Sequence, residues 1–157
     1  MRAGALIYPL LSAYVPLTSL VSASKIFAVR ALQPTTEGYI VYREISGIPT
    51  NTNGPDSPPT TDAPRISERS ILDTYTVQVS AFAGDYLKLE NIAVAIRQAL
   101  DREWGNAPAT YVDDIALDSC VYESCVDDYD DKFGDKGIFI KHLDFTLRVN
   151  RINIENQ

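Results

Sequence analysis

Hydrophobic positions along residues 70–105 change from a two-residue to a 3.6-residue period, which predicts a long strand, a tight turn and a long amphipathic helix. Gly84 and Asp85 break the alternation, and Asp85 is placed to cap the helix. A helix with one wide apolar face has to pack against a sheet. The positions expected to be apolar and buried are Ile71, Tyr75, Val77, Val79 and Ala81 of the strand and Leu89, Ile92, Ala93, Ile96, Ala99 and Leu100 of the helix.

Other alternating segments supply the rest of the sheet. Strands are predicted over residues 25–31, 39–46, 112–121 and 138–149. The strand at 112–121 is expected to place Ile115, Leu117, Ser119 and Val121 on one side. The last strand has an apolar and a polar face, formed by Leu143, Phe145, Leu147 and Val149 and by His142, Asp144, Thr146 and Arg148.

The N-terminal segment can be interpreted in two ways. Its positive residue, apolar run and following small residues are typical of a secretory signal. Pro9 and Pro16 interrupt that run, and several polar side chains dilute it, so a buried first helix over residues 2–14 is the preferred interpretation. Leu6 and Leu10 lie on its buried side, Pro9 kinks it or delays its start, and a short helical turn follows at 16–21.

The order of these elements predicts an α+β fold. Its sheet is expected to be mostly antiparallel or mixed, with about five strands, helices packed on one face and a long exposed hairpin loop. That loop spans residues 47–69, which are rich in proline, threonine and asparagine and cannot form a core. An interdomain linker is the alternative, but residues 1–46 are too short to fold alone. Residues 1–157 are therefore expected to form a single domain.

Charge is concentrated in one part of the chain. The sequence has 14 basic and 21 acidic residues, a net charge of −7, which argues against a broad surface that neutralises nucleic-acid phosphates. Between Asp113 and Lys136, nine carboxylates outnumber two lysines, so this run alone accounts for the net charge. It could be a solvated loop, a calcium site without the EF-hand register, or an acidic wall that repels DNA.

No catalytic, metal-binding or cofactor-binding motif is present in the sequence. His142 and Asp144 share a strand face and could orient an imidazole, but no nucleophile accompanies them. A surface or subunit contact is the alternative role for His142. Cys120 and Cys125 are too few for a disulfide scaffold and fit free thiols in a reducing environment or one local disulfide.

Four segments of the chain carry a resemblance to a known family: PLTSLV, KIFAVRALQPTTEGYIVYREISG, TVQVSAFAGDYLKLENIAVAIRQAL and YESCVDDYDDKFGDKGIFIKHLDFTLRV. Taken in order, they resemble the tail-completion or tail-terminator proteins of long-tailed bacteriophages. The resemblance covers about Leu6 to Val149, and the proline-rich and acidic loops depart from the family pattern. It implies a non-enzymatic ring, usually hexameric, that caps the tail tube at full length and joins it to the head.

This resemblance implies a virion protein assembled in the host cytoplasm, with no cofactor and no membrane. Its expected partners are further copies of itself, the tail tube protein and a head-completion or neck protein, while DNA passes through without specific binding. Another neck or connector ring, a small soluble enzyme and a secreted binding domain are the alternatives. Candidate subunit or tube contacts are Ile48, Pro49, Pro55, Pro58, Pro59 and Arg65, and candidate lumen or charged contacts are Asp127, Asp128, Asp130, Asp131 and Asp135.

Overall fold

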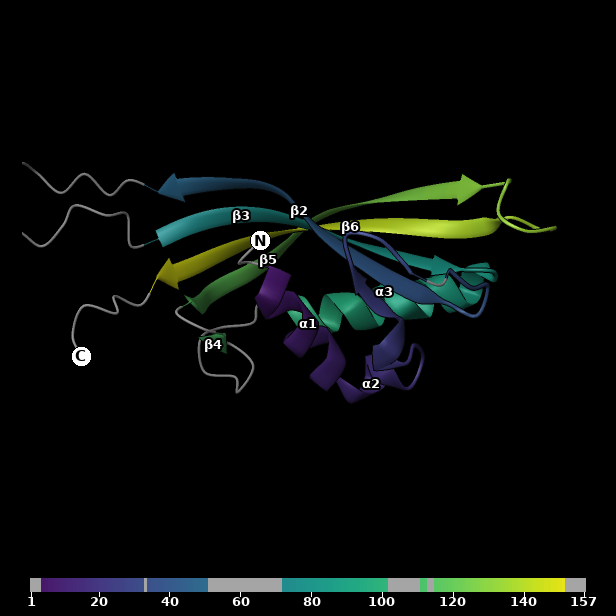
Figure 1. The fold of residues 1–157 in the computed structure, drawn as a ribbon, viewed down its shortest axis with the longest axis horizontal. Helices are drawn as coiled ribbons and strands as arrows, with labels where there is room; N and C mark the ends of the chain where they lie inside the picture. Colours follow the sequence, from purple (N-terminus) through teal and green to yellow (C-terminus); the bar gives the residue numbers. More distant parts are fainter. Residues whose placement is uncertain (1–3, 33, 51–71, 102–110, 113–114, 152–157) are drawn as a thin grey trace, which may run out of the picture.

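A computed structural model describes residues 4–32, 34–50, 72–101, 111–112 and 115–151, which form one six-stranded sheet with helices on one face (Figure 1). The strand order is β1-β2-β3-β6-β5-β4. β1 pairs with β2 in parallel and every other neighbouring pair is antiparallel, so the sheet is mixed. The predicted α+β class is confirmed. The strands are β1 (Ile26–Ala28), β2 (Tyr39–Thr50), β3 (Leu72–Ala83), β4 (Tyr111–Val112), β5 (Ile115–Asp130) and β6 (Ile138–Arg151).

The helices cover the lower face of the sheet in Figure 1. The long helix α3 (Tyr86–Leu100) packs on β3, β6 and β5, and α1 (Gly4–Ala13) packs against α3 and β2. α2 (Val15–Thr18) and a short 3₁₀ turn (Ala23–Lys25) connect α1 to β1. In the described part of the chain, every helix is too short or too polar to span a lipid bilayer.

The predicted N-cap of α3 and the predicted buried faces of both main helices are confirmed, while the predicted start of the first helix at residue 2 lies outside the described residues. The Asp85 carboxylate accepts a hydrogen bond from the Lys88 backbone N–H at 3.1 Å, as an N-cap should. Leu6 and Leu10 of α1 are buried, and Pro9 lies inside this helix. The N-terminal apolar run is therefore part of the core, as the buried-helix interpretation expects.

The core lies between the helices and the apolar face of β3 and β6. The predicted apolar positions of α3 are all buried, and so are Val77 and Val79 of β3. Phe145 of β6 is fully buried, and the Tyr122 ring of β5 packs edge-on against it with centroids 5.7 Å apart. Burying a side chain of this size stabilises the fold by about 1.5–3 kcal/mol.

β1 is shorter than the predicted strand at 25–31, and its end has a local cause. Val29 adopts φ 65°, a left-handed conformation that costs energy for a β-branched residue. Its N–H still donates to the Tyr42 carbonyl at 2.8 Å, but the next N–H, of Arg30, turns back to the Ala28 carbonyl. The chain therefore leaves the sheet after three paired residues.

β2 and β5 are both longer than predicted. The sequence pattern places residues 47–50 in the proline-rich loop, yet these residues continue β2 and pair with β3 as far as Leu72. β5 extends to Asp130, well past the predicted end at residue 121, while Val112 belongs to the separate strand β4. The rest of the predicted loop, residues 51–69, lies outside the described residues.

Two register shifts in β5 make its predicted faces wrong. The register against β6 shifts between Leu117 and Ser119 and again between Tyr122 and Ser124. Each shift corresponds to a bulge, which inserts one residue and exchanges the two faces. As a result Cys120 is buried on the same side as Leu117, whereas Val121, expected beside Leu117, is exposed.

Candidate functional site

The two segments chosen from the sequence as functional loops lie at opposite ends of the sheet. β2 ends and β3 begins at the Thr50–Leu72 pair, and Leu72 lies opposite Asn150 of β6. The turn between β5 and β6 follows the Asp130–Ile138 pair at the other end (Figure 1). The strands between them fix the separation of these two described ends.

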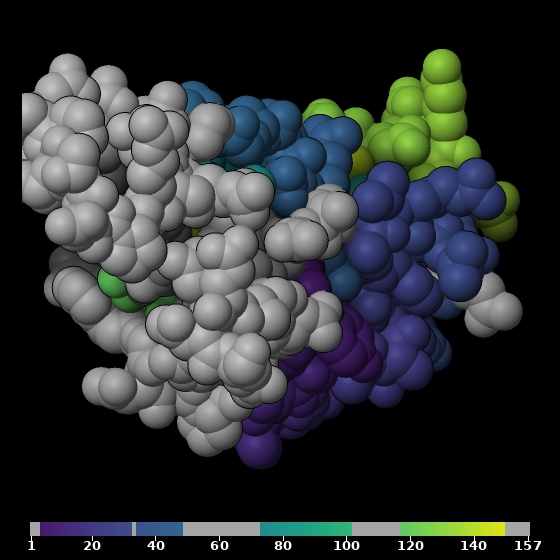
Figure 2. Space-filling model, turned by 60° about the vertical axis from the view of Figure 1, so that its left-hand side comes forward, coloured from purple at the N-terminus to yellow at the C-terminus, as the bar shows by residue number. Residues whose placement is uncertain are grey.

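Most of the acidic segment is strand, not loop. Asp127, Asp128 and Asp130 lie in β5, which corrects the prediction of an acidic loop from residue 123 onward, and only Asp131 and Asp135 lie in the turn. Charged side chains are compatible with a strand here because, in the described residues, no strand pairs with the outer edge of β5 beyond Ala116. Figure 2 shows this green segment projecting beyond the blue surface of β2.

The acidic side chains of β5 divide between the two faces of the sheet. Asp127 pairs with Lys141 on the helix side, whereas Asp128 pairs with Ile140 on the opposite, open face. Asp130, two pairs further on, lies on the same side as Asp128. Within the described residues, no group of three acidic, histidine or cysteine side chains is arranged to hold a metal ion.

Asp127 is held by a charged cluster that joins β5 and β6 to α3. Lys141 is buried, and its Nζ bonds to Glu90 of α3 and to Asp127, the latter at 3.1 Å. Tyr86 of α3 donates its hydroxyl to Asp127 at 3.2 Å. Burial lowers the pKa of Lys141, but the hydrogen bonds to the two carboxylates outweigh it and leave the pKa above its ordinary value. Asp127 is thus neutralised within the chain.

The turn after β5 is fixed by an aromatic side chain. Tyr129 donates its hydroxyl to the Lys136 carbonyl at 2.7 Å, and its ring packs on Phe139 with centroids 5.0 Å apart. Gly137 has φ 71°, and a Cβ there would lie 2.3 Å from the Tyr129 hydroxyl. The turn therefore requires glycine at this position, both for its conformation and for the space it leaves.

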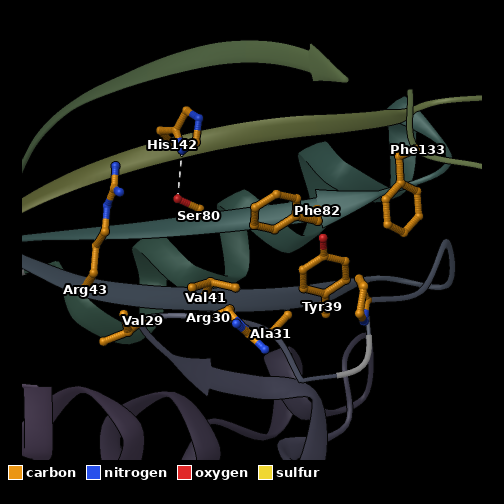
Figure 3. A pocket seen from close by; sticks show the side chains of 11 residues that line it. Val29, Arg30, Ala31, Tyr39, Val41, Arg43, Ser80, Phe82, Phe133 and His142 are labelled. Carbon is orange, nitrogen blue, oxygen red and sulfur yellow. Dashed lines mark hydrogen bonds between the residues drawn. The ribbon is translucent and has the colours of Figure 1, made fainter. Parts of the chain in front are cut away.

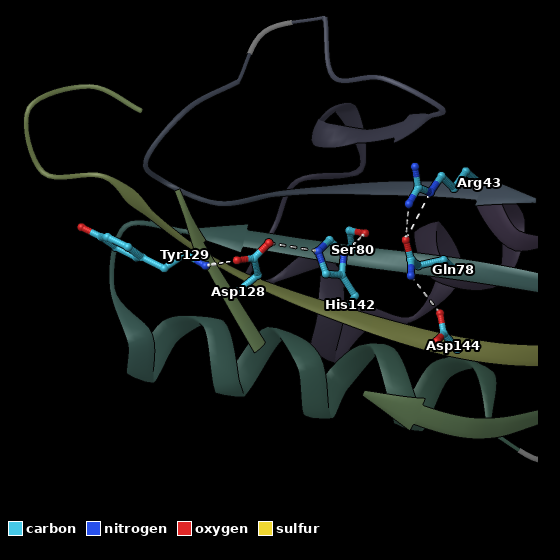
Figure 4. A network of polar contacts seen from close by, with 7 residues as sticks. All are labelled: Arg43, Gln78, Ser80, Asp128, Tyr129, His142 and Asp144. Carbon is cyan, nitrogen blue, oxygen red and sulfur yellow. Dashed lines mark hydrogen bonds and ion pairs between the residues drawn. The ribbon is translucent and has the colours of Figure 1, made fainter. Parts of the chain in front are cut away.

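A chain of polar side chains on the open face joins β2, β3 and β6 (Figure 4) and continues to β5. Arg43 of β2 donates to the Gln78 side-chain oxygen at 2.7 and 3.2 Å, and Gln78 of β3 donates to Asp144 of β6 at 3.0 Å. Ser124 of β5 donates to the other oxygen of Asp144 at 3.2 Å. Sequence reasoning missed Arg43 and Gln78, although both occupy polar alternation positions on neighbouring strands.

His142 and Asp144 do not form the pair considered from the sequence. The Nδ1 atom of His142 lies 2.7 Å from the Ser80 hydroxyl, and its Nε2 lies 3.9 Å from Asp128, too far for a hydrogen bond. Ser80 is buried in the middle of the sheet, with β2 and β6 paired to it on both sides. The structure therefore pairs His142 with Ser80 of the neighbouring strand instead of with Asp144.

A groove of about 400 Å³ lies on the open face beside these residues (Figure 3). Tyr39 and Phe82 stack at 4.4 Å between ring centroids and form part of its apolar lining. Arg30 and Arg43 belong to the lining on the β1–β2 side, and Phe133 belongs to it from the turn after β5. The groove is therefore apolar inside, with cationic side chains on one side.

The predicted contact residues before β3 are only partly described. Ile48 lies in β2 with 64% of its surface exposed, and Pro49 lies opposite Asp73. Pro55, Pro58, Pro59 and Arg65 lie outside the described residues. Elsewhere, Cys120 is buried, and Cys125 is an exposed free thiol.

Comparison with known proteins relates the fold to one assembled particle. No protein-family model and no curated protein matches the sequence. A solved structure of the virion of a native gene transfer agent particle contains a chain with a similar fold, at a TM-score of 0.62 and 17% sequence identity. The match covers 94% of this chain and 96% of that chain. The protein therefore shares its fold, over nearly the full length of both chains, with a protein found in that virion.

Proposed function

We propose that this protein is a structural component of a phage-like virion, where it forms the ring that terminates the tail tube. The observation that carries the proposal is the fold shared with a chain of the gene transfer agent virion, which extends over nearly all of both chains. The resemblance of the sequence to tail terminators was found independently of that comparison. Both lines of evidence lead to the same class of assembly.

The geometry suits a subunit that contacts neighbours on several sides. A rigid sheet and helix layer presents an open face of polar and apolar side chains, and each end of the sheet carries a hairpin. The end of β5 carries carboxylates that would disfavour adhesion of DNA moving past it. The proposed partners are other copies in a hexameric ring, the tail tube protein and a head-completion or neck protein.

A non-enzymatic role fits the polar groups of the open face. Arg43, Gln78, Asp144 and Ser124 hydrogen-bond one another in a chain across the sheet. Such bonds cross-link strands and hold the face rigid. The Ser80 hydroxyl makes a similar contact between strands, since it lies 2.7 Å from Nδ1 of His142 on β6.

Removal of the gene from a particle-producing strain tests the proposal. Without a terminator, tail tubes should continue past their normal length and heads should remain without tails in electron micrographs. Antibody labelling of complete particles should place the protein at the head-proximal end of the tube.

The same experiment separates the alternative role. Loss of a neck or connector ring should leave tubes of normal length that fail to join heads. Two results together would contradict any role in the virion: particles of normal length and yield from the deletion strain, and absence of the protein, by mass spectrometry, from particles of the unmodified strain.

A further inference from the structure

The groove on the open face carries two arginines that form no ion pair within the described part of the chain. Its lining includes the guanidinium groups of Arg30 and Arg43, together with His142, and no carboxylate. Arg43 bonds to the neutral Gln78. Among the described residues neither arginine makes an ion pair. Two exposed cations beside apolar surface favour a partner that brings carboxylates.

The carboxylate of Asp128 lies at the edge of the groove, 3.9 Å from His142, but out of reach of Arg43. Asp128 lies in β5, and β3 and β6 separate that strand from Arg43 in β2. Three strand spacings amount to about 14 Å, far beyond the contact distance of an ion pair. The hydrogen-bonded ladders on both sides prevent a closer approach, so Arg43 and Asp128 can meet only between two molecules.

The end of β5 next to the turn, residues 126–130, is called its outer end, and it also matches the groove in its apolar character. Val126 lies on the open face next to Asp128 in the alternation, with 59% of its surface exposed. The groove offers Val41 and the exposed Val29 beside its arginines. Arginine binds carboxylates through paired, charge-assisted hydrogen bonds, which fix orientation as well as adding affinity.

We infer that the groove is a docking site for a second copy of this chain, which inserts the outer end of its β5. Val126 of the incoming strand covers the apolar lining, and Asp128 and Asp130 meet Arg43 and Arg30. The inference rests on the proposed function in one respect, the assembly of copies with one another. It adds the surfaces that meet and the charges that select them.

Such an interface is head-to-tail. The arginines of the groove lie on the β1–β2 side of the open face and the acidic strand lies on its β5 side, so a molecule whose β5 meets its neighbour's arginines still offers its own arginines to a third. Heterologous contacts of this kind generate closed rings when the rotation between copies closes. The charge difference across the sheet, basic near β2 and acidic along β5, therefore gives the ring a direction.

Charge reversal with complementation tests the inference. The variants Arg43→Glu and Asp128→Arg should each weaken self-association at least tenfold by sedimentation equilibrium and native mass spectrometry. An equimolar mixture of the two should regain association. When the two variants alternate, the introduced glutamate faces the introduced arginine at one junction, and the native Arg43 faces the native Asp128 at the next. Arg30→Glu, which breaks no hydrogen bond described above, should act like Arg43→Glu.

Matched controls separate this effect from a general loss of charge or folding. Arg148→Glu changes an exposed arginine on the open face of β6, outside the groove, and should leave association as in the wild type. Asp118→Arg reverses the charge of an exposed carboxylate of β5 far from residues 126–130, and it should also leave association as in the wild type. Circular dichroism and thermal melts establish that each variant is folded.

Each outcome decides the inference. If Arg43→Glu, Arg30→Glu and Asp128→Arg all leave self-association unchanged, the inference is overturned. The proposed virion role then still stands, with another partner in the groove. Loss in the single variants without rescue on mixing also overturns the inference. So does a wild-type protein that remains monomeric at the highest soluble concentration. Absence from purified particles instead refutes the proposed function.

Discussion

The two faces of β6 show how one strand separates stability from surface chemistry. On the helix side, Leu143, Phe145 and Leu147 are buried under α3. On the open side, His142 and Asp144 are half-buried and hydrogen-bonded to neighbouring strands. Because successive side chains alternate, a change of one residue along the chain exchanges a packing role for a polar one. We therefore expect adjacent substitutions to differ strongly.

The largest contrast is expected between Phe145→Ala and Thr146→Ala. Phe145 is fully buried and contacts Tyr122, so its truncation leaves a cavity and should lower the free energy of unfolding by about 3–5 kcal/mol. Thr146 is half-buried on the open face, and its truncation should cost less than about 1 kcal/mol. Urea denaturation of both variants measures the difference. Equal losses in the free energy of unfolding would show that Thr146 is packed as tightly in the free protein as Phe145.

A second contrast concerns the turn between β5 and β6. In Gly137→Ala, the new Cβ would meet the Tyr129 hydroxyl and the Asp130 carbonyl at 2.3 and 2.7 Å, so we expect a loss of about 2–4 kcal/mol in the free energy of unfolding. Gly134 has a similar φ of 64° but open space around it, and Gly134→Ala should cost only about 1 kcal/mol. Urea denaturation distinguishes steric from conformational cost. A loss at Gly134 as large as at Gly137 would assign the whole effect to φ.

The helix-covered face was largely predictable from the sequence because its signals are uninterrupted. In β3, α3 and β6 the hydrophobic period runs without a break, and Asp85 has the spacing of an N-cap. Local chemistry and burial favour the same structure in these elements. The predicted faces therefore agree with the observed ones.

The open face and the strand ends were less predictable, for identifiable physical reasons. The bulges at Asp118 and Glu123 exchange the faces of β5, and no residue type at these positions predicts a bulge. The run of aspartates resembled a loop because charges are rare in central strands, but β5 has an open edge where they are tolerated. Pro49 suggested a loop because proline cannot donate a backbone hydrogen bond to a neighbouring strand. Proline is nevertheless accepted at an unpaired strand edge, and in the described residues β1 pairs with β2 only as far as Tyr42. The groove depends on Arg30 and Phe133, which reach it from connections whose path no periodicity encodes.

Lys141 is an exception on the helix side, and it yields an intermediate prediction. Lys141→Met keeps the aliphatic stem but leaves Glu90 and Asp127 without their cation. Since both carboxylates are partly exposed, we expect a loss of about 1–2 kcal/mol rather than the full penalty of a buried pair. Lys136→Met, in the exposed turn, is the control and should change stability by less than about 0.5 kcal/mol.

The pH dependence of that difference has a defined sign. The pKa of Lys141 is higher in the folded than in the unfolded chain, so protonated Lys141 stabilises the fold below the unfolded pKa of about 10.4. The stability difference between wild type and Lys141→Met should be constant at neutral pH and shrink as pH rises above that value. Taking the difference removes the contribution of tyrosines that titrate in the same range. A difference that grows with pH would contradict the assigned ion pair.

The smallest expected effect lies in the polar chain of the open face. Asp144→Ala removes the acceptor of Gln78 and Ser124, but water can reach Ser124, and Gln78 retains Arg43. We expect a loss of about 1 kcal/mol in the free energy of unfolding. A double-mutant cycle with Gln78→Ala should give a coupling energy of about 0.5–1 kcal/mol, whereas Asp144 paired with a distant site such as Asp85→Ala should show none. Coupling near zero between Gln78 and Asp144 would mean that the bonded chain orders the open face without stabilising it, and that the two faces of β6 differ even more than their burial implies.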